Sequence, residues 1–166
     1  MVDTILRDAE RSDALQIANI YNYYIENTVI TFEEQLVSAL DIQERIEKIQ
    51  QAGHIWLVAE IDEKIVGYAY SAPWRDRSAY RFASEVSVYL SNNSQGNGVG
   101  SLLYQSLFER LKSTEIKILI GGITLPNEAS VALHEKFGLE KVAHFRDVGF
   151  KFDQWLDVGY WQLKLS

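Results

Sequence analysis

The chain contains no cysteine and only two prolines among its 166 residues. The absence of cysteine excludes disulfides, thiolate metal ligands and a cysteine nucleophile, so no acyl group can be carried on a cysteine between two half-reactions. Basic residues are also scarce, because 16 Lys and Arg stand against 23 Asp and Glu and give a net charge of −7. A general nucleic-acid surface needs clustered Lys and Arg, so we expect no nucleic-acid partner.

Long apolar runs are missing as well. No stretch approaches the ~20 apolar residues of a membrane span, and the first eight residues lack the basic flank of a targeting segment. We therefore expect a cytoplasmic protein with no membrane partner. With 47% apolar residues, a chain of this length can bury a core without disulfides, and we expect a single domain over residues 1–166.

The spacing of apolar residues predicts a mixed sheet with helices on both faces, an α/β fold in the broad sense. Strands are expected over residues 4–7, 55–61, 64–71, 83–90, 117–123, 139–146 and 156–165. Helices are expected after Ser12 or Asp13, which can cap the first one, around residues 42–49, after residue 98, and over residues 126–136. The element order is therefore βααβββαβαββ.

Two helices have apolar faces that can be predicted in detail. The first helix is expected to bury Ile17, Ile20, Tyr21, Tyr24 and Ile25. The helix after residue 98 is expected to bury Val99, Leu102, Leu103, Leu107 and Leu111.

A glycine-rich turn over residues 95–100 (Gln-Gly-Asn-Gly-Val-Gly) leads from an expected strand into an expected helix. The dinucleotide fingerprint Gly-x-Gly-x-x-Gly fails in both registers, because Ser101 and Leu103 stand where the third glycine belongs. A P-loop needs a Gly-Lys-Ser/Thr ending and is excluded, because no lysine occurs between Lys64 and Lys112. Glycine permits positive φ and close approach to a ligand, and the free N–H groups of a helix start attract anions. The turn indicates either a pyrophosphate site or a plain strand-to-helix connection.

The pattern Gln95-x-x-Gly98-x-Gly100, with this element order, resembles the GNAT superfamily of acyl-CoA N-acyltransferases. Further ordered segments over almost the whole chain resemble one branch, the phosphinothricin and methionine sulfoximine/sulfone acetyltransferases. These segments include residues 20–22, 56–60, 74–80, 85–89, 125–127, 148–151 and 155–157. The resemblance implies a mostly antiparallel, splayed sheet of six to seven strands with helices on both faces. It also implies a homodimer formed near the last strands.

The same resemblance implies acetyl-CoA as co-substrate and direct transfer to the acceptor in a ternary complex. No metal is expected, because His54 and His144 have no metal-ligand spacing with His134. The pantetheine arm is expected to lie along Val86, Ser87 and Val88 like an added strand. The remaining cofactor contacts are expected from Gln95, Gly96, Asn97, Gly98, Val99, Gly100, Ser101, Asn127 and Ser130. At Asn127, a plain helix cap is the alternative, and both functions can coexist.

Acetyl transfer needs a base for the amine and stabilisation of the departing thiolate. Glu85 is the carboxylate nearest in sequence to the inferred thioester site, and the family places its catalytic glutamate there. Its alternative is a strand-end glutamate in a salt bridge. His134 lies two turns after Asn127 on one expected helix, where many members of the superfamily have a tyrosine that protonates the thiolate. A structural histidine is its alternative.

The acceptor is expected to be a small molecule that resembles an amino acid. Arg75, Arg77 and Arg81 come just before Glu85, and a guanidinium grips a carboxylate or phosphinate at two points. The phosphinothricin type favours Arg77 and the methionine-sulfone type favours Arg75 and Arg81, while a solvated basic loop is the alternative. Tyr80 belongs to the same segment. Phe32 can wall the pocket or simply pack in the core.

Two other functions stay open. One keeps the fold and cofactor but acetylates a protein N-terminus, a ribosomal alanine or a polyamine, although the arginines argue against the polyamine. The other is a catalytically idle acyl-CoA-binding sensor. Resistance to a herbicide-like amino acid and detoxification of an oxidised metabolite would need the same chemistry, so the biological acceptor is not predicted.

Overall fold

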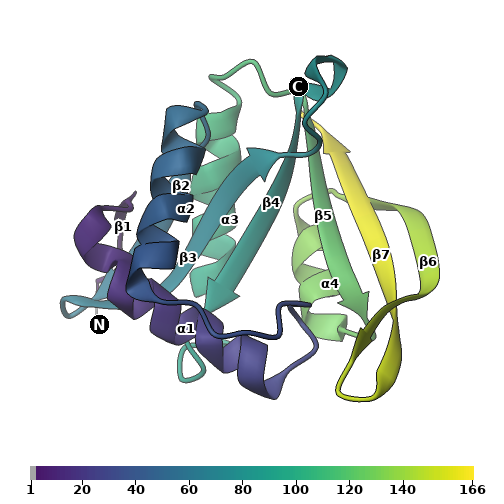
Figure 1. Ribbon diagram of the computed structural model, residues 1–166. Helices are drawn as coiled ribbons and strands as arrows, with labels where there is room; N and C mark the ends of the chain where they lie inside the picture. Colours follow the sequence, from purple (N-terminus) through teal and green to yellow (C-terminus); the bar gives the residue numbers. More distant parts are fainter. Residues whose placement is uncertain (1–2) are drawn as a thin grey trace.

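One seven-stranded sheet organises the computed structural model, which describes residues 3–166 (Figure 1). The strands are β1 (Ile5–Asp8), β2 (Trp56–Ile61), β3 (Lys64–Pro73), β4 (Ala83–Leu90), β5 (Ile118–Leu125), β6 (Glu140–Lys151) and β7 (Gln154–Lys164). Their order across the sheet is β1-β2-β3-β4-β5-β7-β6. Every neighbouring pair is antiparallel except β4 and β5, so the expected mostly antiparallel sheet is confirmed.

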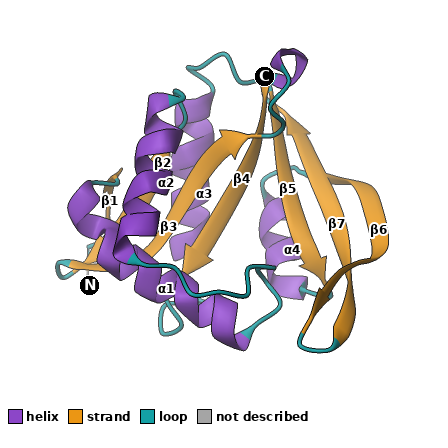
Figure 2. Cartoon of the chain, viewed as in Figure 1, coloured by secondary structure: helices purple, strands orange, loops and turns teal. Residues whose placement is uncertain are grey.

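Helices cover both faces of this sheet (Figure 2). They are α1 (Ala14–Asn27), α2 (Ala39–Gln51), α3 (Val99–Leu111) and α4 (Glu128–Lys136), with short 3₁₀ turns η1 (Arg11–Asp13) and η2 (Ser78–Tyr80). The expected order βααβββαβαββ is confirmed. None of the helices formed by residues 3–166 has the length and apolar character needed to cross a bilayer.

Alternation along the strands divides the apolar residues between two cores. Tyr68 on β3 packs with α1 and α2, whereas its neighbour Ala69 packs with α3 on the opposite face. On β4, Val86 belongs to the core under α3 and Tyr89 packs against the core under α1. Because side chains alternate along a strand, Glu85 shares the α1/α2 face with Tyr89.

Most local predictions for the helices are confirmed, with two exceptions. All five predicted residues of the α1 face are buried. Asp13 is the N-cap of α1 but its carboxylate does not cap the helix, because it accepts two hydrogen bonds from Arg7, at 2.8 and 2.9 Å. Leu102 is 42% exposed, because the buried face of α3 is centred on Leu103 and Leu107, and Leu102 is turned about 100° away from Leu103.

Strands β4 and β5 separate near the middle of the sheet. Their parallel pairing covers only three steps, Ala83 with Ile118, Ser84 with Leu119, and Glu85 with Ile120. Beyond Glu85 the two strands diverge, as the V-shaped gap in Figure 1 shows. The backbone of β4 from Val86 onward therefore keeps β3 as a partner on one side and has no β5 partner on the other.

Candidate functional site

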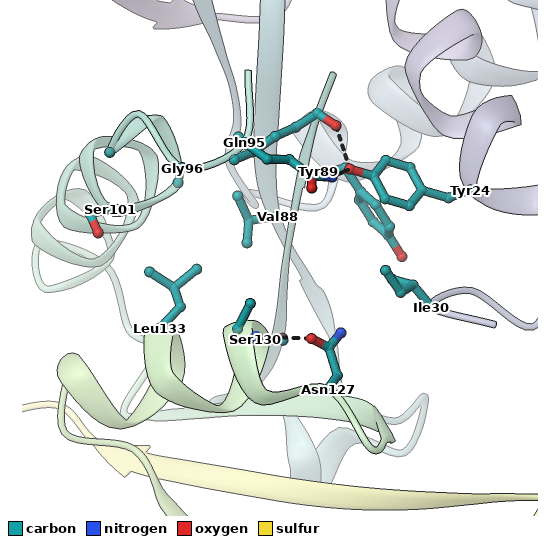
Figure 3. Close-up of a pocket in the computed structure, with 14 residues that line it drawn as sticks. Tyr24, Ile30, Val88, Tyr89, Gln95, Gly96, Ser101, Asn127, Ser130 and Leu133 are labelled. Carbon is teal, nitrogen blue, oxygen red and sulfur yellow. Dashed lines mark hydrogen bonds between the residues drawn. The ribbon is translucent and has the colours of Figure 1, made fainter. Parts of the chain in front are cut away.

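A groove of about 310 Å³ follows the open side of β4 (Figure 3). Its walls come from the end of α1, the loop before α2, β4, the glycine turn, the start of α3, and α4. The lining residues are Tyr24, Ile30, Val88, Tyr89, Leu90, Gln95, Gly96, Gly98, Gly100, Ser101, Asn127, Ala129, Ser130 and Leu133.

The glycine turn has the backbone geometry of an anion site. Gly96 and Gly98 have φ of +84° and +80°, and a Cβ built on either would meet no atom within 4 Å. Gly98 is the N-cap of α3, and no side chain caps that helix. The N–H groups of the first turn of α3 are therefore left for a ligand, and the open space lets a phosphate approach the backbone.

A lysine adds positive charge at this rim, and the sequence analysis did not identify it. Lys136, the last residue of α4, donates a hydrogen bond from Nζ to Ser101 Oγ at 2.9 Å. The two residues are 35 positions apart, so no local motif joins them. Lys136 therefore places a positive charge next to Ser101, a lining residue of the groove, on a chain with net charge −7.

The twelve expected cofactor residues fall into three groups. Eight of them line the groove: Val88, Gln95, Gly96, Gly98, Gly100, Ser101, Asn127 and Ser130. Val86 and Ser87 line the smaller hollow that continues from it. Asn97 lines neither, and Val99 is 3% exposed and packs in the core under α3.

Two polar side chains at the groove are held by hydrogen bonds. Gln95 Nε2 donates to the hydroxyl of Tyr24 at 2.9 Å, and that hydroxyl donates to the carbonyl of Leu90. Asn127 caps α4, because its Oδ1 accepts a hydrogen bond from Ser130 N at 3.1 Å, which leaves its amide N–H₂ free of that contact (Figure 3). Tyr24 was not a predicted site residue, since its spacing marked it only as core.

A smaller hollow of about 50 Å³ lies in the gap between β4 and β5, with His134 among its lining residues. The His134 ring is buried and lies against Gly121, where an added Cβ would come within 2.6 Å of the ring. Its Nδ1 lies 2.7 Å from the carbonyl of Ser130, so Nδ1 carries the hydrogen. Burial lowers the pKa of His134, which favours the neutral ring.

Tyr104 completes this arrangement from α3. Its hydroxyl lies 3.0 Å from His134 Nε2, and because Nδ1 holds the ring hydrogen, Tyr104 is the donor. Tyr104 is buried and lines the same hollow. Tyr104 was not predicted as a site residue, because an aromatic residue next to the predicted apolar face of α3 is typical of the core.

Glu85 lies at the point where β4 and β5 separate. An added Cβ at Gly122 on β5 would lie 3.5 Å from Glu85 Oε2, which places the carboxylate across the gap. Burial raises the pKa of Glu85, opposed by the positive charge of Arg75. No salt bridge among residues 3–166 includes Glu85, so the salt-bridge alternative finds no support.

The three arginines of the β3–β4 connection are all exposed but differ in their contacts. The Arg75 guanidinium lies 3.9 Å from the Trp74 ring centroid, and of the three arginines only Arg75 acts on the pKa of Glu85. Arg81 lies over Phe82 and donates to the carbonyl of Ser78. Arg77 is the N-cap of η2, and Tyr80 within η2 is exposed.

Phe32 reaches the C-terminal half of the sheet from the loop between α1 and α2. Its ring covers Gly149 on β6, where an added Cβ would lie 2.3 Å from the ring. The ring is 40% exposed, so Phe32 is not a core residue. It lies on a loop that joins the two diverging halves of the sheet.

Comparison with known proteins gives one consistent result. Residues 6–159 match the family described as acetyltransferase (GNAT) domain. The chain is 35% identical to phosphinothricin N-acetyltransferase of Streptomyces viridochromogenes, over 95% of this chain and 85% of that protein. It is 31% identical to the L-methionine sulfoximine/L-methionine sulfone acetyltransferase of Salmonella typhimurium, over 97% and 94% of the two chains.

A solved structure agrees with these relatives. The phosphinothricin acetyltransferase of Sinorhizobium meliloti, crystallised in complex with acetyl-CoA, superposes with a TM-score of 0.95 at 34% identity. The superposition covers 98% of this chain and 89% of that one.

Proposed function

Because the chain belongs to the GNAT acetyltransferase family, we propose that it transfers the acetyl group of acetyl-CoA to the α-amino group of a small amino acid or analogue. The acceptor would be of the phosphinothricin, methionine sulfoximine or methionine sulfone type. One observation carries the proposal: the open edge of β4 joins a helix start suited to an anion at one end to the half-buried carboxylate of Glu85, which forms no salt bridge within residues 3–166, at the other.

Acetyl-CoA, the acetyl donor, binds in the groove along the open edge of β4. The N–H groups at the start of α3, with Lys136, bind the pyrophosphate. The pantetheine arm pairs with the free backbone of β4 from Val88 towards Val86, which directs the thioester into the gap beside Glu85. Asn127 caps α4 through its oxygen and offers its N–H₂ group to the arm.

Glu85 acts as the general base. An amino-acid ammonium loses a proton to the carboxylate, directly or through one water, and the amine nitrogen attacks the thioester carbonyl carbon. The N–C bond forms, the C–S bond breaks, and the second proton of the attacking nitrogen ends on the departing sulfur, so the products are the N-acetyl amino acid and free CoA. A pKa raised by burial brings the carboxylate closer to the operating pH, which makes it a better base.

The departing thiolate is stabilised by Tyr104 and His134 acting as a pair, and not by His134 alone. The neutral ring of His134 accepts at Nε2, so the hydrogen between the two side chains belongs to Tyr104. A hydroxyl that turns from Nε2 towards the sulfur would stabilise the developing negative charge. His134 then serves as a positioning residue that fixes the tyrosine hydroxyl.

The acceptor enters from the α1/α2 face, opposite the donor. Arg75 is the arginine whose charge reaches Glu85, and we assign it to the acceptor carboxylate. Phe32 walls the pocket from the loop that reaches β6. Arg77, Tyr80 and Arg81 lie farther along the same connection and would contact larger or more polar acceptors.

A second copy of the chain would cover the β6–β7 hairpin. Six large apolar side chains of the hairpin are at least half exposed: Val142, Phe145, Val148, Phe150, Phe152 and Trp155. Large exposed apolar side chains gathered on one hairpin are typical of a surface that another protein covers. Aromatic residues are also enriched at the centres of subunit interfaces.

The deciding experiment is release of CoA from acetyl-CoA in the presence of phosphinothricin, methionine sulfoximine, methionine sulfone and the common amino acids. Acceptor-dependent release with the expected N-acetyl product supports the proposal. Acetylation of a peptide N-terminus or a polyamine alone would assign a different acceptor. Acetyl-CoA binding without release for any acceptor would indicate an acyl-CoA sensor.

A further inference from the structure

Residues 91–98 connect β4 to α3 and carry the glycine turn. They belong to no helix or strand. Gly96 and Gly98 both have positive φ, and nothing lies within 4 Å of a Cβ built on either residue. Glycine restricts the backbone less than any other residue, so packing alone does not fix this segment. Its conformation depends on the hydrogen bonds that hold it.

Most of these hydrogen bonds are local. Ser94 is bound to Ser91 through the backbone at 2.9 Å and through the two hydroxyls at 2.7 Å. Ser91 N donates to the carbonyl of Val66 on β3 at 2.8 Å. Beyond Ser91, the only hydrogen bond that joins the segment to a distant part of residues 3–166 is the bond from Gln95 Nε2 to the hydroxyl of Tyr24 on α1, at 2.9 Å (Figure 3).

The Tyr24 hydroxyl joins the start of the glycine turn to the end of β4. It donates its hydrogen to the carbonyl of Leu90, the last residue of β4, and therefore accepts from Gln95. Burial raises the pKa of Tyr24, so the hydroxyl keeps the hydrogen that this arrangement needs. Because Leu90 and Gln95 bind the same oxygen atom, the chain between them is closed into a fixed loop.

The Tyr24 ring is itself held in place. It is 4% exposed and meets the rings of Tyr23 and Tyr89 edge to face, with centroids 5.5 and 5.3 Å away. A side chain that is already fixed by packing loses little further entropy when it forms a hydrogen bond. Tyr24 is therefore a rigid point on α1 that can restrain the flexible turn.

Tyr24 holds the turn at a distance from the reacting atoms. Leu90 lies five residues after Glu85 on β4, about 16 Å along an extended strand. The backbone of Tyr24 has separate contacts, because its carbonyl accepts from the N–H and the hydroxyl of Thr28, at 3.2 and 2.8 Å. Loss of the hydroxyl alone therefore leaves the end of α1 and the start of the next loop in place.

We infer that Tyr24 is a positioning residue for the acetyl donor, because its hydroxyl holds the glycine turn in the conformation that binds the pyrophosphate. The inference rests on the proposed binding of acetyl-CoA at this turn and adds to it a residue from α1. With the turn held in advance, the pyrophosphate meets N–H groups that already point towards it. Binding then does not have to order the glycines, which would weaken the affinity.

The first test is Tyr24→Phe, which removes the hydroxyl and keeps the ring. We expect the Kd of acetyl-CoA, measured by calorimetry, to rise about 3- to 10-fold, the typical effect of one hydrogen bond. The kcat and the acceptor KM should stay within about twofold. Hydrogen exchange over residues 91–98 of the free protein should increase. Tyr23→Phe, at the neighbouring ring with 37% exposure, should change neither the Kd nor the exchange.

Gln95→Leu separates positioning from a general loss of stability. Gln95 is exposed, so this variant breaks the same hydrogen bond without altering the core and should show the same rise in exchange over residues 91–98. Because both residues act through one bond, the double variant should bind acetyl-CoA within about twofold of the weaker single variant. Full multiplication of the two single effects, or exchange that increases equally throughout α1 and the sheet, would overturn the inference.

The same calorimetry distinguishes this inference from the proposed function. If the unaltered protein binds acetyl-CoA and Tyr24→Phe binds it equally well, the inference is overturned and the proposed function stands. If the unaltered protein does not bind acetyl-CoA, both are overturned.

Discussion

Lys151 on β6 donates a hydrogen bond from Nζ to the backbone carbonyl of Thr31, at 2.8 Å, across 120 positions of sequence. The Lys151 side chain is almost entirely buried, and burial lowers its pKa. Thr31 is held from the other side as well, because its hydroxyl lies 2.7 Å from the hydroxyl of Tyr21 on α1. The loop that carries Phe32 is thus fixed to helix α1 on one side and to strand β6 on the other.

Removal of this contact should loosen the acceptor pocket. In Lys151→Met the loop loses its bond to β6, so we expect the KM for the acceptor to rise several-fold while the KM for acetyl-CoA stays within about twofold. Lys164→Met, an exposed lysine on β7, is the matched control. Steady-state kinetics measure both constants, and hydrogen exchange over residues 28–38 should increase in the first variant only. Unchanged acceptor KM with faster exchange would show that the loop does not shape the pocket.

The pH dependence of kcat/KM should show the protonation of the Glu85 carboxylate. Because burial raises its pKa above the ordinary value of 4.5, the carboxylate gains its proton earlier as pH falls, and activity should decline on the acid side at a pH above 4.5. Glu85→Gln should abolish this limb and reduce kcat/KM ~10²–10⁴-fold, with little change in acetyl-CoA affinity. Glu115→Gln, at an exposed site, controls for the change in charge. Full turnover by Glu85→Gln at neutral pH would exclude it as the base.

The glycine turn can be tested with a matched pair of substitutions. Gly98 has φ +80° at the groove, and Gly53 has φ +82° at the end of α2, with open space around both. Valine at either site incurs similar left-handed strain, ~1–2 kcal/mol. Only Gly98→Val places a branched side chain where the phosphate approaches, so it should weaken acetyl-CoA binding at least about tenfold in calorimetry. Equal affinities of the two variants would place the cofactor elsewhere.

A catalytic function of the Tyr104–His134 pair can be distinguished from a structural one by measuring activity and stability of the same variant. Tyr104→Phe leaves His134 Nε2 buried without a donor, so it should lower the free energy of unfolding by ~1–3 kcal/mol. If the hydroxyl also stabilises the thiolate, kcat should fall ~10-fold or more while both KM values stay similar. Tyr23→Phe on the exposed side of α1 is the control. A lower melting temperature with unchanged kcat would mean that the pair is structural.

The sequence predicted what depends on local periodicity and missed what depends on distant contacts. The face of α1 and the β2–β3 hairpin around Asp62 follow from patterns within ten residues or so. The prediction for Asp13 was wrong because its carboxylate binds Arg7 from another element and does not cap α1. The prediction for Leu102 was wrong because the buried face of α3 is centred one residue further along the helix. Tyr104 and Lys136 were missed because each meets its partner 30 or more positions away. Residues so far apart in the sequence form no local pattern of fixed spacing, so a motif cannot predict that they meet.

The assembly state can be tested at the exposed hairpin. Trp155 is 68% exposed on β7, and its ring lies beside that of Phe150 with centroids 4.7 Å apart. If a second copy covers this surface, Trp155→Glu buries an unpaired charge in the interface and should convert a dimer to a monomer in light scattering. Leu15→Glu, at a 61% exposed leucine on α1, makes a comparable change far from the hairpin and should leave the dimer intact. A monomeric unaltered protein, or dissociation by both variants alike, would contradict the proposed interface.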